Sequence, residues 1–466
     1  MSEEVRTSIH GQWSSRMTFI LAATGSAVGL GNIWKFPYIA GENGGGAFVI
    51  VYLACIAVIG IPIMMAEILL GRRGRRSPIN TMRYLAVEEQ RPASWGLLGW
   101  LGVVGGFLIL SYYSVIAGWA LSYVFRTASG IFNGATADGV GSIFTEFVSN
   151  PESSLAWHTI FMIITMIIVS RGVKHGIERA VTYLMPSLFV LLIILIFYAM
   201  STGYFIQGLE FLFSPDFSKL NAESVLVAMG HAFFTLSLGM GAIMVYGSYL
   251  PKKTSIAKAT MMIAAADTLV ALLAGMVIFP IVFANNLEPG IGPGLIFQTL
   301  PIAFGQMEAG VLIGTLFFVL LTFAALSSSI SLIEPAVAWL VENKHMTRVS
   351  ASVWCGLATW LVGIGSVLSF NLWSGRTWSL SLFGETLFEN KTFFDTLDGL
   401  TANIMLPLGG LFIAIFAGWM MRPEHSKSEL NTYERGYTVW INLVRVIAPA
   451  AVMVVFLNVI GVISFD

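Results

Sequence analysis

The chain of 466 residues is 56% hydrophobic and only 11% charged, whereas roughly 25% of the residues are charged in a typical soluble domain. Its formal net charge of −1 gives no reason to expect a nucleic-acid partner. Cys55 and Cys355 stand apart in apolar runs, so neither a disulfide framework nor a zinc site is indicated. The composition excludes an ordinary soluble protein and indicates that the lipid bilayer is the main solvent of the chain.

Apolar runs of about 20 residues recur along the sequence. Lipid cannot hydrogen-bond to open peptide groups, so such runs must be helices, and the predicted fold class is an all-α polytopic membrane protein. The first run follows a short polar segment without a cleavage-site pattern, and we expect it to stay in the protein. We predict about eleven spans, near residues 15–38, 46–70, 94–125, 156–170, 177–199, 226–249, 256–284, 307–341, 349–370, 397–421 and 438–463.

Lysine and arginine concentrate on one side of these spans. The segments on the side of the N-terminus hold most of them, and the opposite side holds only Arg126, Lys219, Arg376 and Lys391. The positive-inside rule then places the N-terminus in the cytoplasm and the C-terminus outside, in a multi-pass protein of the plasma (inner) membrane.

The predicted spans divide into two sets of five, which necessarily have opposite orientations in the membrane. Inverted repeats of this kind underlie many secondary transporters. We predict a single transporter domain over 1–466, with a first repeat over 13–199, a second over 226–421 and an additional helix over 438–463. The first span of each set carries a glycine cluster midway, Gly25 to Gly31 and Gly239 to Gly241, and these clusters are candidate helix breaks.

The first glycine cluster contains Gly25, Gly29 and Gly31 and is followed by Asn32. Each glycine destabilises a continuous helix by roughly 1 kcal/mol relative to alanine. In an unwound turn, free carbonyl groups can coordinate a cation, and the N–H groups of the following half-helix favour a carboxylate. Close helix packing is the alternative, because the spacing of Gly25 and Gly29 also matches the small-xxx-small pattern. A dinucleotide site is excluded, since no strand precedes the cluster.

Hydroxyl groups cluster in two further spans. Thr235 and Ser237 precede the second glycine cluster, and span eight holds Ser327, Ser328, Ser329 and Ser331. Hydroxyls in membrane helices often bond to the preceding turn, which is the structural interpretation of each one alone. Four within five residues favour a functional one, because hydroxyl and carbonyl oxygens form a weakly charged cage suited to a monovalent cation.

Ionisable residues inside a membrane are costly and mark function by default. Here they are Lys35, Glu67, Asp267, Glu334 and Asp398. Lys35 and Asp398 lie toward the outer side, where they either pair as a gate or extend separately to the interface. Asp267 is deep inside its span and needs a cation, a proton or a hydrogen-bond donor.

At these residues the sequence resembles the neurotransmitter:sodium symporter family, whose fold is the ten-helix inverted repeat typified by bacterial leucine transporters. The matching segments cover both repeats and run from Gly25 to Pro37, Glu42 to Phe48, Gly60 to Arg72 with Glu67, Phe233 to Gly239 and Ser327 to Ser329.

The resemblance implies two sodium sites. The first would use the carbonyls of Ala27 and Thr235, the side chains of Asn32, Thr235 and Asp267, and the carboxylate of the substrate. The second would use the carbonyls of Gly25, Val28 and Ala324 and the hydroxyls of Ser327 and Ser328.

The same resemblance implies a substrate pocket in which Tyr113 donates to the substrate carboxylate and Phe234 forms the roof. Its members would be Ser26, Ala27, Leu30, Gly31, Ile109, Tyr113, Phe234, Thr235, Ser237, Met240, Ser328 and Leu332. Monoamine transporters of the family look to have an aspartate in the first break, where this chain has a small residue, which argues for an amino acid that brings its own carboxylate. The side-chain end is apolar, so we expect a hydrophobic amino acid. The flexible Met240 would admit larger side chains, aromatic ones included.

Several positions depart from the family pattern. Lys35 replaces an arginine at the outer gate, which loses the bidentate pairing with Asp398. At the inner gate, Tyr249 and Glu342 occupy the partner positions, but His10 stands where an arginine is expected, and Arg6 is a candidate substitute.

The departure with the largest consequence lies in span seven. Asp267 stands where the family usually has asparagine, and Ala271 stands where chloride-dependent members have serine and chloride-independent members an acid. We hypothesise that ionised Asp267 supplies the fixed negative charge near the first sodium ion and makes chloride unnecessary.

The sequence thus predicts sodium-coupled import of a hydrophobic, including aromatic, L-amino acid by alternating access, and no enzymatic activity. A channel would show a continuous polar stripe along one pathway instead of isolated clusters at mid-membrane. An intramembrane enzyme would need a nucleophile beside a base, and only His231 lies inside a span, without a serine partner. The identity of the amino acid, the sodium stoichiometry, proton antiport through Asp267 and the oligomeric state stay open.

Overall fold

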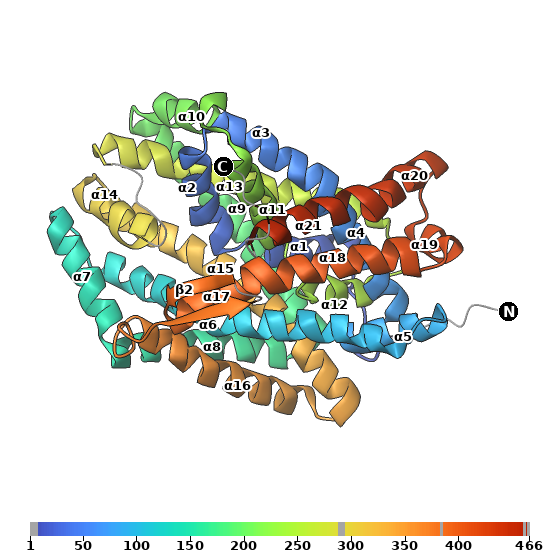
Figure 1. The fold of residues 1–466 in the computed structure, drawn as a ribbon. Coiled ribbons are helices and arrows are strands. Elements are labelled where there is room, and N and C mark those ends of the chain that lie inside the picture. The colour runs from blue at the N-terminus through green and yellow to red at the C-terminus, as the bar shows by residue number, and fades with distance from the viewer. Residues whose placement is uncertain (1–7, 288–293, 383–384, 460–462, 464–466) are drawn as a thin grey trace.

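The computed structural model describes residues 8–287, 294–382, 385–459 and 463. The long helices run in a similar direction through the molecule, from the end marked N to the end that carries α7 and α14 (Figure 1). The helices that are single and long are α6 (Gly96–Ala128), α8 (Pro151–Ser170), α9 (Arg179–Ser201), α13 (Ile256–Ala284), α15 (Gly310–Lys344) and α16 (Arg348–Ser369). This architecture is that of a helical bundle crossing a membrane.

Other spans consist of shorter helices joined by π-helical turns. The pieces are α1 (Arg16–Ala27), the turn Gly31–Lys35 and α2 (Phe36–Glu42); α3 (Gly46–Cys55) and α4 (Ile61–Gly74); α17 (Phe393–Gly399) and α18 (Leu406–Ile415); and α20 (Glu434–Asn442) and α21 (Ala448–Val459). Within the described residues, nine helices or fused helices are long and apolar enough to cross a membrane, and the bent pair Arg16–Ala27 with Gly31–Glu42 makes ten. The predicted span 226–249 is present as α11 (Ala222–Thr235) and α12 (Ala242–Ser248), each too short to cross alone.

Several elements lie between the spans. They are α5 (Pro78–Glu88), α7 (Ala137–Ser149), α10 (Phe205–Phe213), α14 (Leu300–Gln306), α19 (Pro423–Leu430) and an antiparallel hairpin of β1 (Trp378–Leu382) and β2 (Glu385–Lys391). The all-α, inverted-repeat fold class predicted from the sequence is confirmed, and the hairpin is a small addition that the apolar pattern did not indicate.

Polar signals in the sequence set the helix ends. The Ser15 hydroxyl accepts a hydrogen bond from the Thr18 N–H at 3.1 Å and caps α1. At α8, Asn150 accepts from the Ser153 N–H at 2.9 Å, and Pro151 occupies the first helical position. Such caps satisfy N–H groups that have no partner within the helix.

Glycines allow the broken helices to approach their neighbours closely. A Cβ atom added at Gly71 of α4 would lie 1.9 Å from the Met244 carbonyl oxygen of α12. The carbonyl oxygen is a backbone atom, and a Cβ atom is fixed directly to the backbone. Rotation of a side chain could therefore not relieve the clash. The position of α12, and with it the second helix break, therefore depends on a residue without a side chain at Gly71.

We predict that Gly71→Ala destabilises the purified protein, because α4 and α12 must separate; overpacking of this kind costs about 1–3 kcal/mol. The measurement is the thermal unfolding temperature in detergent. Gly141→Ala in α7 is the matched control, since no atom lies within 4 Å of its added Cβ. An unchanged unfolding temperature for Gly71→Ala would show that the contact is not needed.

Candidate functional site

The first break lies between α1 and the turn at Gly31, and its two halves are bent by 57°. Val28 has extended backbone angles, which end α1. Side chains beyond α1 accept hydrogen bonds from the exposed peptide groups. The Gly29 N–H donates to Asn32 Oδ1 at 3.0 Å, and the Leu30 N–H donates to the Tyr113 hydroxyl at 3.4 Å. The unwound turn predicted from the glycine cluster is present, so close packing is not its sole purpose.

The second break separates α11 from α12. Ser237, Gly239 and Gly241 have positive φ angles of 54°, 79° and 74°, a conformation that glycine adopts without strain and that is uncommon for serine. The Gly239 N–H donates to Glu67 Oε1 at 2.5 Å, and Glu67 is fully buried. The Ser237 hydroxyl donates to the Ser26 carbonyl at 2.8 Å. The two breaks are thus tied directly to one another.

A cavity of about 30 Å³ lies between the two breaks. All twelve residues predicted for the substrate pocket line it, from Ser26 to Leu332, together with Gly29 and Asn32. Ile109, Met240 and Leu332 contribute apolar side chains to its walls, and residues of the first break line it as well. Among the described residues, no lysine, arginine or histidine contributes to the lining. A molecule held here would meet both peptide dipoles and hydrocarbon.

Asn32, Thr235 and Asp267 form a hydrogen-bonded cluster beside this cavity. The Asn32 amide donates to Asp267 Oδ1 at 2.7 Å and to the Thr235 hydroxyl at 3.0 Å. The Thr235 hydroxyl lies 3.0 Å from Asp267 Oδ2. Asn32 and Asp267 are fully buried, and in the described part of the chain Asp267 has no ion-pair partner. A buried carboxylate in this setting is suited to a cation.

A second group of oxygen atoms joins α1 to α15. The Ser328 hydroxyl lies 3.3 Å from the Gly25 carbonyl, 3.1 Å from the Val28 carbonyl and 3.2 Å from the Ala324 carbonyl. Ser327 Oγ lies 3.0 Å from the same Ala324 carbonyl. The five groups predicted for the second site therefore converge. They are neutral oxygens, which suit a hard monovalent cation, and within the described residues no group of three or more His, Cys, Asp or Glu side chains could hold a metal ion.

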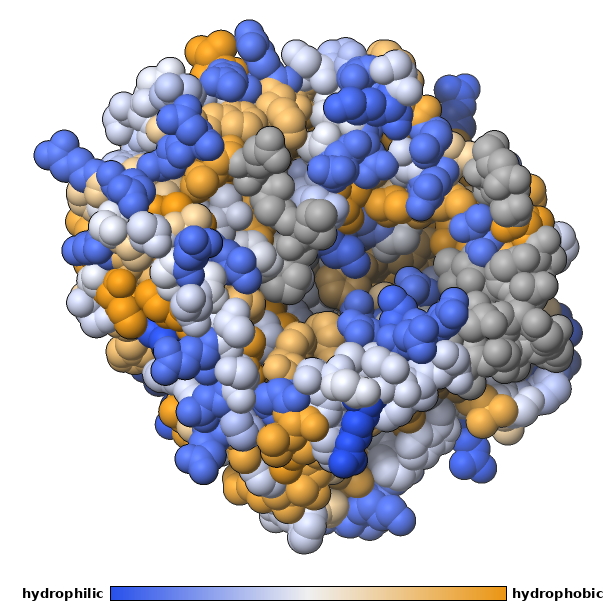
Figure 2. Space-filling view, turned by 60° about the vertical axis from the view of Figure 1, so that its left-hand side comes forward, coloured by the Kyte–Doolittle hydropathy of each residue, from blue (hydrophilic) through white to orange (hydrophobic). Residues whose placement is uncertain are grey.

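A larger cavity of about 300 Å³ adjoins the pocket. Leu30, Gly31, Tyr113 and Phe234 line both cavities and so lie between them. Figure 2 views the end of the molecule that carries α7 and α14, and this end is hollowed at its centre, with hydrophilic side chains around the hollow.

The two residues predicted for the outer gate, Lys35 and Asp398, both line this larger cavity, but no ion pair joins them. The Lys35 ammonium group instead lies 5.1 Å from the centre of the Phe234 ring, in a cation–π contact. The structure therefore places Lys35 over the roof of the pocket and leaves the predicted gate pair apart.

A dense polar network surrounds Glu342 at the end of the molecule where α1 begins. Its carboxylate lies 3.1 Å from His10 Nε2 and accepts from the Ser77 N–H at 2.7 Å, the Ser77 hydroxyl at 2.6 Å and the Asn80 amide at 2.6 Å. Of the residues predicted for the inner gate, Glu342 thus contacts His10, which stands where an arginine was expected, whereas Tyr249 bonds to Glu334. Arg6, the other candidate, lies outside the described residues.

Tyr249 takes part in a neighbouring network. Its hydroxyl donates to Glu334 Oε1 at 2.7 Å, and Glu334 also pairs with Arg348. The Trp13 indole donates to the Tyr246 carbonyl at 3.0 Å, and Trp13 is 2% exposed. These contacts join the segment before α1, α12 and α15 at the end of the molecule where α1 begins.

Some functional contacts were not assigned from the sequence. Glu67 and Glu334 were recognised only as intramembrane acids, without their partners Gly239 and Tyr249. Ser331 accepts from the Ser26 hydroxyl at 2.8 Å and fixes the end of α1 at the pocket. The excess of serine in span eight was the available signal for Ser331.

The fold and the site define a class of protein. Two discontinuous membrane helices meet at a small enclosed cavity, with a hollow on one side and a sealed network on the other, and this arrangement is that of a secondary transporter. The isolated polar clusters at mid-membrane do not form the continuous polar stripe expected of a channel.

Comparison with known proteins gives the family. A family model described as the sodium:neurotransmitter symporter family matches residues 10–133 and 147–386. The uncharacterized sodium-dependent transporter YhdH of Bacillus subtilis is 40% identical over 97% of this chain and 98% of its own. An uncharacterized sodium-dependent transporter of Haemophilus influenzae is 36% identical over 96% of this chain and 97% of its own. The chain belongs to the sodium:neurotransmitter symporter family.

The fold is also that of a solved member. The crystal structure of MhsT in complex with L-phenylalanine superposes with a TM-score of 0.87 and 44% sequence identity, over 96% of this chain and 99% of MhsT. The family resemblance inferred from the broken-helix motifs is confirmed.

We predict that Glu342→Ala opens the inner side, because His10, Ser77 and Asn80 lose their shared acceptor. Hydrogen exchange read by mass spectrometry should rise in the segment from His10 to Arg16 by about tenfold, as expected for a loss of about 1.4 kcal/mol in local stability. Asn343→Ala is the control, since that exposed amide bonds only within its own helix, to the Trp339 carbonyl. Equal exchange in the two variants would contradict a sealing role for Glu342.

Proposed function

We propose that the protein is a sodium-coupled symporter that imports a hydrophobic L-amino acid, aromatic ones included, by alternating access. The observation that carries the proposal is the mixed lining of the pocket, in which the first helix break and apolar side chains meet beside two clusters of oxygen atoms. MhsT, which was crystallised with L-phenylalanine, supports this substrate class. The family supports coupling to sodium.

Charge balance in the pocket explains the coupling. Among the residues that the structure describes, no cationic side chain lines the pocket, and Asp267 lies buried beside it. A substrate carboxylate at the first break would add a second negative charge in a medium of low dielectric constant. A sodium ion among Asn32, Thr235, Asp267, the carbonyls of Ala27 and Thr235 and the substrate carboxylate would compensate one of these charges, and the ammonium group of the amino acid would compensate the other. Substrate and ion would then each favour the binding of the other.

The second sodium ion would sit among the carbonyls of Gly25, Val28 and Ala324 and the hydroxyls of Ser327 and Ser328. Since these groups belong to α1 and α15, an ion there holds the two helices together. It would bind best in the conformation in which the inner network is closed, and its release would favour opening toward the cytoplasm.

The apolar end of the pocket sets the side-chain preference. Ile109, Met240 and Leu332 offer no hydrogen-bond partner through their side chains, so a polar amino-acid side chain would lose its water without compensation. Met240 has three rotatable bonds and can repack around aromatic or branched groups. Tyr113 would donate to the substrate carboxylate, and Phe234 would cover the substrate.

Chloride is not needed in this proposal. Ala271 lies one helical turn from Asp267 on α13 and is fully buried. Its methyl side chain has no hydroxyl group that could donate a hydrogen bond to an anion. The carboxylate of Asp267 already provides the negative charge near the first sodium ion.

The remaining assignments of the sequence form part of the same proposal. The rocking units would be the repeats 13–199 and 226–421, with 438–463 as an additional helix. Lys35 and Asp398 would close the outer cavity, and Tyr249 and Glu342 would close the inner side. The N-terminus would lie in the cytoplasm and the C-terminus outside, in the plasma (inner) membrane.

Uptake into proteoliposomes tests the function. We predict that an inward sodium gradient drives accumulation of labelled L-phenylalanine and that an equal potassium gradient does not. Unlabelled leucine, tryptophan and tyrosine should compete, whereas aspartate and lysine should not, because each would bury an unpaired charge. Sodium-independent accumulation would refute the mechanism, and competition by charged amino acids alone would refute the substrate class.

A serine pair tests the second ion site. We predict that Ser328→Ala raises the sodium concentration for half-maximal uptake by about tenfold. This is the change expected when loss of one ligand weakens the binding free energy of sodium by about 1.4 kcal/mol. Ser329→Ala is the control, because Ser329 is also buried but its hydroxyl bonds to Leu326 and Thr165, away from α1. The same sodium dependence in both variants would show that Ser328 is not a ligand.

Anion replacement tests the role of Asp267. We predict that sodium-driven uptake is unchanged when chloride is replaced by gluconate on both sides of the membrane, since the fixed carboxylate supplies the charge. In Asp267→Asn the amide keeps the hydrogen bonds but not the charge, so sodium affinity should fall by about tenfold or more. Strict chloride dependence of the unmodified protein would disprove this role.

A further inference from the structure

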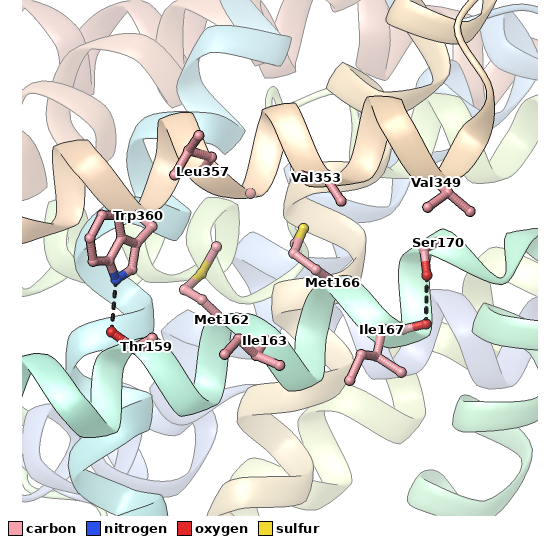
Figure 3. A pocket seen from close by; sticks show the side chains of 11 residues that line it. Thr159, Met162, Ile163, Met166, Ile167, Ser170, Val349, Val353, Leu357 and Trp360 are labelled. Carbon is pink, nitrogen blue, oxygen red and sulfur yellow. Dashed lines mark hydrogen bonds between the residues drawn. The ribbon is translucent and has the colours of Figure 1, made fainter.

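A groove outside the transport pathway runs between α8 and α16 (Figure 3). It has a volume of about 470 Å³ and is lined by six residues of α8, from Thr159 to Ser170, and five of α16, from Val349 to Trp360. Met162 and Met166 rise from α8 toward α16 along it (Figure 3). The groove plays no part in the proposed transport mechanism.

The few polar groups of the groove already have partners. The Trp360 indole donates to the Thr159 hydroxyl at 2.8 Å and closes one end. At the other end, the Ser170 hydroxyl donates to the Ile167 carbonyl at 3.0 Å. The rest of the lining is apolar, so the groove favours a hydrocarbon occupant.

The groove is open to the surroundings of the helix bundle. Ile163 is 53% exposed and Val353 is 55% exposed. Its depth depends on Gly356, where an added Cβ would lie 2.5 Å from Met166 Cγ. An occupant would therefore enter sideways from the lipid and lie along the two helices.

The dimensions favour a single acyl chain. From Thr159 to Ser170 the helix advances by about 16 Å, which is close to half of the ~30 Å hydrocarbon thickness of a bilayer. A volume of about 470 Å³ over this length gives a mean cross-section of about 30 Å². A hydrocarbon chain of one leaflet matches both the length and the width.

Positive charge gathers at one end of the groove. Arg171 follows the lining residue Ser170, and Lys174 lies a turn further on; Lys344 ends α15 just before α16 begins. All three are exposed, and among the described residues none takes part in an ion pair. The charge of Arg348, by contrast, is compensated by Glu334, and its Nε donates to the Val169 carbonyl of α8 at 2.9 Å.

We propose that this groove binds an anionic phospholipid of the inner leaflet. One acyl chain lies between α8 and α16, and the phosphate lies against Arg171, Lys174 and Lys344. By the positive-inside rule, the charged end of the groove faces the cytoplasm. Basic pockets between membrane helices on that side bind anionic lipid headgroups. Because Arg348 joins α16 to both α8 and Glu334, the lipid binds beside the inner network of Tyr249.

Native mass spectrometry of the purified full chain tests the acyl-chain part. The protein is offered phosphatidylglycerol and phosphatidylcholine with identical chains at equal concentrations. Val353→Trp fills the groove and should lower the bound phosphatidylglycerol by about tenfold. Leu361→Trp is the matched control, since Leu361 is also 55% exposed on α16 but does not line the groove. Equal lipid retention in both variants would overturn the proposal.

Charge removal tests the headgroup part. The unmodified protein should retain phosphatidylglycerol over phosphatidylcholine, and the double variant Arg171→Gln, Lys344→Gln should lose that preference while it still binds either lipid. The double variant Lys253→Gln, Lys258→Gln removes the same charge from exposed positions elsewhere and should keep the preference. Equal binding of both lipids by the unmodified protein would overturn the proposal. So would a dimer that Val353→Trp abolishes, because a second copy would then be the occupant.

Discussion

The structure depends on one constraint, which is that peptide groups exposed at mid-membrane must find partners inside the protein. Lipid offers none, and each unsatisfied group costs several kcal/mol. The break between Ala27 and Gly31 exposes both N–H and carbonyl groups. Asn32 and Tyr113 take the N–H groups, and Ser237 and Ser328 approach the carbonyl groups. Three other spans must therefore present polar side chains at this depth, and the site follows from that requirement.

The second break meets the same constraint with a carboxyl oxygen as the acceptor. Glu67 reaches across from α4 to the Gly239 N–H, and Gly71 on the same helix allows α12 to come close enough for this contact. The buried oxygen Oε1 of Glu67 thereby gains a hydrogen-bond donor from the unwound chain. α4 therefore positions one half of the pocket without lining it, and Ser237 transmits this position to the first break.

Local signals in the sequence predicted the two helix breaks, whereas the members of the pocket and of the two oxygen clusters followed from the family resemblance. Glycine clusters reveal where a helix must break, and apolar runs reveal where the spans lie. The pairing of Asn32 with Asp267 followed from the family resemblance. The partners of Glu342 could not be predicted, since Ser77 and Asn80 are more than 260 residues away and belong to a helix outside the spans. Contacts of this kind depend on how helices pack, and the sequence pattern of one segment carries no information about that.

The separation of Lys35 and Asp398 has the same origin. The opposite charges on two spans suggested an ion pair. The side chain of lysine is flexible, however, and it can contact other partners with a similar free energy. The face of the Phe234 ring is the partner of Lys35 here. The end of the molecule near Lys35 is therefore held by fewer contacts than the end near Glu342.

This difference between the two ends defines the energetic problem that a transport cycle must solve. Opening the end of the molecule where α1 begins would break the contacts of His10 with Glu342 and of Trp13 with Tyr246, because they join the segment before α1 to α15 and α12. A ligand can promote such a step only to the extent that it binds the two conformations differently. In the proposed mechanism, an ion between Ser328 and the carbonyls of α1 would oppose the separation of α1 from α15, so its departure would remove one restraint on opening. Coupling would then rest on the same carbonyl groups that the helix break exposes.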